Sequence, residues 1–92
     1  MREIERAGEF KRDYKREFKG RHRATLAADV TAILNALASD IPLDVQFRDH
    51  DLSGDWAGYR ECHIKPDLLL IYSKSEDDIL RLSRLGSHSE LF

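Results

Sequence analysis

The sequence predicts a small α+β protein in which an antiparallel-dominated sheet carries a helical hairpin on one face. Two observations lead to this fold class. Apolar residues recur at helical spacing in the first forty residues, and three short strand-like runs separated by turns fill the last forty. The expected order of elements is β-α-α-β-β-β. The helices lie on the sheet because their apolar stripes need a surface that covers them.

The length of 92 residues suits one domain with one modest core, so we expect residues 1–92 to form a single domain. The longest apolar run, residues 68–72, is far shorter than the roughly 20 residues that span a bilayer. The N-terminus has no apolar stretch of the signal-peptide kind. We therefore expect a cytoplasmic protein with no membrane partner. The single cysteine, Cys62, permits neither an internal disulfide nor a cysteine-based zinc site, and little marks it as a nucleophile.

The first third of the chain predicts a strand and a helix. Ile4 lies among charged residues and can form a short strand, although a frayed terminus is the alternative. Phe10, Tyr14 and Phe18 recur every four residues, which predicts an amphipathic helix whose aromatic stripe packs in the core. Gly20 is expected to end this helix in the left-handed conformation.

A second helix is predicted at residues 24–38, which are rich in alanine and have a regular apolar stripe. Residues 39–42, which include a proline, end it. Residues 43–51 have no clear period, and we expect an ordered loop pinned by Val45 and Phe47.

Three strand-like runs follow, at residues 56–64, 67–73 and 78–85. Residues 65–67 have turn chemistry and join the first two runs as a hairpin, which we expect to hold His63 and Asp67 near each other at one end of the sheet. The middle run is apolar on both sides, which predicts a central strand that is covered on both faces. In the last run, simple alternation places Arg84 on the same face as Leu80 and Leu82, which is the core face.

The net charge of −2 gives no general argument for nucleic-acid binding, but the charge is unevenly distributed. Residues 11–23 contain seven cations and two acids, a local charge of +5, so the rest of the chain carries −7. This segment predicts a patch for RNA, the ribosome or an acidic partner; the alternative is a solvated helix face with ion pairs. The seven cations are Lys11, Arg12, Lys15, Arg16, Lys19, Arg21 and Arg23.

Three of the four histidines, His50, His63 and His88, lie in or beside expected turns. Histidine gives and takes protons near neutral pH. With Asp67 and Arg84, these residues suffice for cleaving an RNA phosphodiester. A base takes the 2′-OH proton, an acid protonates the leaving 5′-oxygen, and a cation holds the phosphate charge. Such chemistry needs no metal.

Other interpretations of the histidines remain open. They could be three zinc ligands, although their spacings of 13 and 25 residues match no local metal motif. Each could also be an ordinary exposed histidine in a turn. Glu61 is a further candidate carboxylate, and His22 is assigned to the basic segment without a role in the site.

Three motifs resemble the YafQ branch of the RelE toxin superfamily. They are DHDL at residues 49–52, GDWAGYRECHIKPD at residues 54–67 and RLGSHSELF at residues 84–92. The resemblance spans nearly the whole chain in the order, length and spacing of its elements. The first forty residues match the family only in their pattern.

The resemblance implies an mRNA interferase, which is an endoribonuclease and the toxin of a type II toxin–antitoxin pair. Members of this family enter the ribosomal A site, cut mRNA by 2′-OH attack without a metal or other cofactor, and so inhibit translation. The resemblance also implies an antitoxin that neutralises the toxin, and contact with operator DNA only through the toxin–antitoxin complex.

The resemblance implies six catalytic positions in this sequence: His50, His63, Asp67, Arg84, His88 and Phe92. Either of the first two histidines is the expected base, and His88 or Asp67 the expected acid. Arg84 would contact the phosphate. Phe92 would stack on or brace a base, a role that the residues alone did not suggest.

Three features depart from the family pattern. The chain is slightly acidic, whereas toxins of this group are usually basic, and Leu68 stands where some relatives carry an aromatic residue. Arg84 can reach the site only if the last strand ends or bulges near it, for which Gly86 offers a reason. The alternative function is therefore a catalytically weak binding module that acts mainly as antitoxin partner and operon co-repressor.

Overall fold

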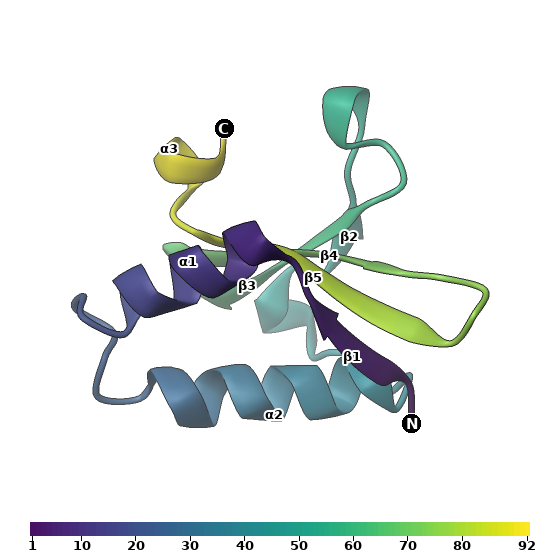
Figure 1. Ribbon diagram of the computed structural model, residues 1–92, viewed down its shortest axis with the longest axis horizontal. Coiled ribbons are helices and arrows are strands. Elements are labelled where there is room, and N and C mark those ends of the chain that lie inside the picture. The colour runs from purple at the N-terminus through teal and green to yellow at the C-terminus, as the bar shows by residue number, and fades with distance from the viewer.

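A five-stranded sheet with the strand order β1-β5-β4-β3-β2 forms the centre of this computed structural model, which describes residues 1–92 (Figure 1). The strands are β1 (Glu3–Arg6), β2 (His50–Asp51), β3 (Arg60–Lys65), β4 (Leu68–Lys74) and β5 (Ile79–Gly86). Strand β1 runs parallel to β5, and every other neighbouring pair is antiparallel. The antiparallel-dominated sheet and the short first strand are therefore confirmed.

The helices are α1 (Gly8–Glu17), α2 (Leu26–Ala38) and the single-turn α3 (His88–Leu91), with two 3₁₀ turns, η1 (Val45–Phe47) and η2 (Gly54–Trp56). Figure 1 shows α2 on one side of the sheet, and α3 and the loop around η2 on the other. This arrangement confirms the α+β class. The sequence predicted neither α3 nor the two-residue strand β2. None of the helices has the length and apolar character needed to cross a membrane.

The main core lies between the two long helices and one face of the sheet. Helix α2 contributes its predicted stripe, and β3, β4 and β5 contribute alternate residues. Each fully buried aliphatic side chain stabilises the fold by roughly 1.5–3 kcal/mol. Phe10 is buried and Tyr14 packs against this core, but Phe18 is 53% exposed. The aromatic stripe is therefore only partly a core stripe, because α1 ends at Glu17.

The end of α1 differs from the prediction. Gly20 does not take a left-handed conformation; instead its N–H donates to the carbonyl of Glu17, one of several tight turns that follow the helix. The left-handed residue lies at the end of α2, where Asp40 has φ 55°. The next N–H, from Ile41, donates to the carbonyl of Ala36 at 2.9 Å, which closes that helix.

The loop before β2 is ordered, as predicted, but only one of its two expected anchors contacts the core. Phe47 packs against the main core, whereas Val45 is 87% exposed. The carboxylate of Asp44 accepts a hydrogen bond from the N–H of Gln46 and so supports the turn η1. Arg48 then has φ 49°, which turns the chain toward β2.

A β-bulge in β5 determines which side of the sheet Arg84 occupies. Tyr72 pairs with Leu82, and Ile71 pairs with Arg84, so Ser83 has no partner on β4. The extra residue reverses the alternation of side chains. The expectation that Arg84 lies on the core face is therefore wrong. The strand contains the bulge that a catalytic role for this arginine requires.

The face of the sheet opposite α2, called the second face below, has a smaller core. Leu69 and Ile71 of β4 contact Leu91 of α3, and Leu52, Trp56 and Tyr59 pack around them. Strand β4 is therefore covered on both sides, as predicted. Trp56 and Tyr59 meet edge to face with ring centroids 5.1 Å apart, so their role is packing.

Candidate active site

Paired residues from four strands form a row across the second face, and those from β2, β3 and β5 are polar. Glu61 of β3 pairs with His50 of β2 on one side and with Ile71 of β4 on the other. Ile71 in turn pairs with Arg84 of β5. Because neighbouring strands lie about 4.8 Å apart, the row extends roughly 14 Å from His50 to Arg84. His63 lies on the same face, two residues along β3 from Glu61.

Glu61 is the shared partner of two histidines. Its side chain is only 8% exposed, and its Oε1 atom lies 3.0 Å from Nε2 of His63 and 3.8 Å from Nε2 of His50. The two imidazole centroids are 6.4 Å apart. Since a carboxylate can only accept a hydrogen bond, Nε2 of His63 carries a proton.

The contact of Nδ1 of His50 indicates which nitrogen of this ring carries the proton. Nδ1 of His50 lies 2.6 Å from the carbonyl oxygen of Arg48, which can only accept. Nδ1 therefore carries the proton, and neutral His50 has a free lone pair at Nε2. A lone pair at this position is what a general base requires.

The loop that carries His50 is anchored by Asp49. The hydroxyl of Tyr72 donates to the Asp49 carboxylate, and Nη2 of Arg60 lies 3.2 Å from the same group. Arg60 also contacts Asp51 at 2.5 Å. Burial and the Asp49 carboxylate raise the pKa of Tyr72 well above its ordinary value, so the phenol stays protonated. These contacts keep His50 beside β3.

His63 is also accessible from the side of η1. A hollow of about 390 Å³ lies there, open to solvent. It is lined by Gln46, Phe47, Arg48, His63, Ile64, Lys65 and Pro66. Arg48 and His63 line the same hollow, so Arg48 adds a cation to this end of the site.

Arg84 is held by a buried carboxylate from α1. Its Nε atom lies 2.7 Å from Oδ2 of Asp13, and its Nη2 atom lies 3.3 Å from Oδ1. Asp13 is 4% exposed and also accepts the N–H of Leu85 at 3.0 Å. Burial favours a higher pKa for Asp13, but the bonds from Arg84 and Leu85 lower it below its ordinary value. Nη1 of Arg84 donates no hydrogen bond within the protein, so it is available to bind a ligand.

The basic segment separates into three groups of cations. Arg16 is bonded within the protein, to Asp13, Glu17, Glu90 and the carbonyl of Leu85. Arg21 forms an ion pair with Asp67. The remaining five have exposed side chains without an ion pair: Lys11, Arg12, Lys15, Lys19 and Arg23. These five are the cations that a polyanion can reach.

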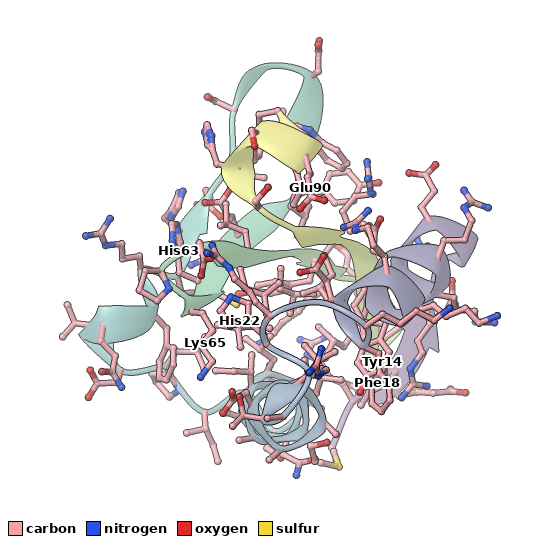
Figure 2. All side chains as sticks on the ribbon, turned by 90° about the vertical axis from the view of Figure 1, so that its left-hand side faces the viewer. Tyr14, Phe18, His22, His63, Lys65 and Glu90 are labelled. Atoms are coloured by element: carbon pink, nitrogen blue, oxygen red, sulfur yellow. The ribbon has the colours of Figure 1, made fainter.

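Asp67 lies in the turn between β3 and β4, and its partners come from the link between α1 and α2. Nε2 of His22 lies 2.9 Å from Oδ1 of Asp67. The structure therefore pairs Asp67 with His22 and Arg21 and not with His63, contrary to the expected hairpin site. No local sequence signal identifies His22, because 45 residues separate it from its partner. Figure 2 shows His22 and Lys65 on the side of the sheet that faces α2.

Helix α3 carries the last two predicted residues. Ser87 and Glu90 form a capping box at its start, and Leu91 packs on the second face. Figure 2 shows Glu90 of α3 on the opposite side of the sheet from α2. The rings of His88 and Phe92 lie 5.0 Å apart on this helix. No hydrogen bond or ion pair joins the side chains of His88 and Phe92 to the row of His50, Glu61 and Arg84.

The structure thus brings His50, Glu61 and His63 together, and places Arg84 in their row. No group of three His, Cys, Asp or Glu side chains is arranged to hold a metal ion. Cys62 is buried on the core side, where burial raises the pKa of its thiol to about 12. At neutral pH this thiol is therefore protonated, as suits a core residue.

Comparison with known proteins agrees with this fold. Residues 2–92 match the family described as bacterial toxin of type II toxin–antitoxin system, YafQ. The chain is 40% identical to the mRNA interferase toxin YafQ of Escherichia coli, across all of this chain and 97% of that protein. It superposes on a metal-bound toxin from Helicobacter pylori with a TM-score of 0.87 and 39% identity, over the whole of both chains.

A second similar structure is the DinJ–YafQ complex of Escherichia coli, with a TM-score of 0.84 and 34% identity over all of this chain and 99% of that one. These matches define the class of the protein as a toxin of a bacterial type II toxin–antitoxin system. Within that class, the chain belongs to the YafQ family. The resemblance stated from its motifs is confirmed.

Proposed function

We propose that the chain is a ribosome-dependent mRNA endoribonuclease that cleaves by metal-free acid–base attack of a 2′-OH group and thereby inhibits translation. Membership of the YafQ family makes it a toxin and an mRNA interferase, the activity for which its Escherichia coli relative is named. The observation that carries the proposed mechanism is the row of His50, Glu61 and Arg84 with His63 beside it.

The base in this proposal is His50 or His63. Neutral His50 has its lone pair at Nε2, so it can take the proton of a ribose 2′-OH. The 2′-oxygen then forms a bond to the adjacent phosphorus while the bond from phosphorus to the 5′-oxygen breaks. The products are a 2′,3′-cyclic phosphate and a free 5′-OH. Glu61 orients His63 and stabilises the positive charge that either ring gains with a proton.

Arg84 is proposed to hold the negative charge of the phosphate through its free Nη1 group. The acid that protonates the 5′-oxygen is His88 in this proposal, because Asp67, the other expected acid, is paired with Arg21 and His22 and not with the row. His88 is next to Phe92, whose exposed ring can brace a base. The distance of roughly 14 Å across the row leaves room for a nucleotide between the histidine pair and Arg84.

The proposed partners follow the same reasoning. The exposed cations of residues 11–23 would meet ribosomal RNA, since neutralised phosphates dominate such affinity. The Escherichia coli YafQ structure contains DinJ, and we propose a corresponding antitoxin for this chain. Operator DNA would be bound only through that complex. The site of action would be the cytoplasm, with residues 1–92 acting as one domain.

The test is cleavage of a defined mRNA in a cell-free translation reaction, with cut sites mapped by primer extension. The wild type should cut at defined codon positions, and His63→Ala should cleave about 10²- to 10⁴-fold more slowly. Asp77→Asn, in the exposed turn between β4 and β5, is the control. A transition-metal chelator that spares Mg²⁺ should leave the rate unchanged.

The same variants distinguish the alternative function. Expression of the wild type should arrest growth, and His88→Ala should be tolerated at the same protein level. Equal growth of both, with no cut mRNA from folded wild-type protein, would favour the toxin-like binding module.

A further inference from the structure

Asp13 joins helix α1 to the end of β5 that carries Arg84. We propose that Asp13 is the positioning residue for Arg84 and that, through Arg16, the same helix also places α3. The inference rests on the proposed function, in which Arg84 contacts the scissile phosphate. It assigns an active-site role to two residues of α1 that lie outside the row of polar residues.

The first step is the edge of β5. Strand β1 pairs with β5 only from Ile79 to Leu82, so the following residues have no neighbouring strand on that side. At Leu85, two side chains of α1 form hydrogen bonds to the backbone of β5 in place of the missing strand. Asp13 accepts the N–H of Leu85 at 3.0 Å, and Nη2 of Arg16 donates to its carbonyl at 2.9 Å. Helix α1 is thereby bonded to the strand immediately after the bulge.

The second step is the orientation of the guanidinium group. An arginine on a strand can occupy many rotamers, and only some of them direct Nη1 toward a phosphate. Asp13 binds Arg84 through both Nε and Nη2, which determines the plane of the group and leaves Nη1 free. The carboxylate is itself immobilised, because Leu85 and Arg16 also donate to it.

The third step leads to α3. Nε of Arg16 lies 3.2 Å from Oε2 of Glu90. Glu90 also accepts the N–H of Ser87 in the capping box of α3. A Cβ atom added to Gly86 would lie 2.8 Å from Nη2 of Arg16, so a larger residue at this position would displace the end of that side chain. Arg16 therefore contacts both ends of the segment that places His88 and Phe92.

Stability alone does not explain a buried carboxylate at this position. A buried ion pair contributes little net stability compared with apolar residues of the same volume, because both charges lose their hydration. An apolar residue at position 13 would leave the N–H of Leu85 without an acceptor and Arg84 without an orienting partner. A neutral acceptor would be sufficient for the N–H, so the charge of the carboxylate is explained by the arginine that it holds.

The experiment separates kcat from KM in the ribosome-dependent cleavage reaction. Asp13→Asn should lower kcat about 10- to 100-fold and change KM by less than about 3-fold, because it loosens a group that acts on the transition state. The matched control is Asp77→Asn, the same chemical change at an exposed turn. In an Arg84→Gln background, Asp13→Asn should lower kcat by less than about 2-fold.

Independent effects would overturn the inference: if the losses of Asp13→Asn and Arg84→Gln multiply, Asp13 does not act through Arg84. Wild-type kcat in folded Asp13→Asn would overturn it as well. If that variant does not fold, Asp13→Glu gives the answer, since a longer carboxylate should keep the melting temperature but lower kcat about 3- to 10-fold.

A second readout does not depend on activity. In ¹⁵N-labelled wild type, the Nε–Hε signal of Arg84 should be protected from exchange with water, and Asp13→Asn should abolish this protection. If the wild type cleaves no mRNA, the proposed function fails while this measurement still decides the positioning role. An unprotected Arg84 signal in the wild type would refute that role.

Discussion

Nε2 of His22 lies 2.9 Å from Oδ1 of Asp67, and Arg21 forms an ion pair with the other oxygen of the same carboxylate. These contacts join the link between α1 and α2 to the turn between β3 and β4. A neighbouring ion pair, from Lys65 to Asp29 at 2.9 Å, attaches the same turn to α2. The helical hairpin therefore helps to place Asp67.

His22→Ala should lower the free energy of unfolding by about 1 kcal/mol, because one hydrogen bond to a partly exposed carboxylate is lost. Cleavage should fall by less than about 10-fold, since Arg21 still holds Asp67. Urea unfolding and the cleavage rate measure the two effects. Arg21→Ala, at a more exposed position, should change the unfolding free energy less. A larger loss of stability in Arg21→Ala than in His22→Ala would contradict this interpretation.

Glu61→Ala should slow cleavage by about 10-fold or more, because His63 loses its hydrogen-bond acceptor and both rings lose the nearby carboxylate that stabilises a gained positive charge. The loss should be smaller than that of His63→Ala, since Glu61 orients the base without replacing it. Single-turnover rates on ribosomes measure the difference. Glu76→Gln, in an exposed turn, is the control. Wild-type cleavage by folded Glu61→Ala would mean that the two histidines need no orienting carboxylate.

The cations of residues 11–23 should differ in their effect on ribosome binding. Lys11→Gln and Lys15→Gln should each weaken binding and reduce the slope of log affinity against log salt concentration by about 0.7–0.9 if they contact phosphates. Arg16→Gln should leave the slope unchanged, because its guanidinium is already bonded within the protein. Binding to isolated ribosomes at several salt concentrations gives these slopes. Equal slopes for all three variants would refute the distinction between the exposed lysines and Arg16, which is bonded within the protein.

Short-range patterns in the sequence predicted the elements that hold the core. The stripe of α2 and the two-sided apolar run of β4 are visible as periodicity, because each depends on neighbours a few residues away. The motifs around His50, His63 and Arg84 predicted the family, which the comparisons confirm. The capping box of Ser87 and Glu90 is also a readable signal, and it could have predicted α3.

Contacts between distant segments were not predictable in the same way. Asp13 and Arg84 are 71 residues apart, and nothing near either residue in the sequence indicates the other. The bulge at Ser83 has no glycine at its own position to mark it in the sequence. It reverses the alternation of side chains along β5, and this depends on how β4 and β5 pair. Asp67 was expected beside His63 because the two are close in the chain. Their actual partners depend on how the helical hairpin packs.

Asp40 provides a prediction for acid pH. It accepts hydrogen bonds from Lys74 at 2.8 Å and Arg2 at 2.9 Å, which lower its pKa from 3.8 to about 2. A carboxyl group whose pKa is lower in the folded state stabilises the fold above its unfolded pKa, and this contribution disappears as pH falls through the folded pKa. The stabilisation by Asp40 should therefore be complete above about pH 5 and lost between about pH 4 and pH 2.

Asp40→Asn isolates this effect, because asparagine tolerates the left-handed conformation that Asp40 adopts at φ 55°. The difference in unfolding free energy between wild type and variant should be constant above about pH 5 and should shrink toward zero near pH 2. Urea unfolding at a series of pH values measures it, and Asp77→Asn is the matched control at an exposed turn. A difference that stays constant down to pH 2 would mean that Arg2 and Lys74 do not stabilise the charged form of Asp40.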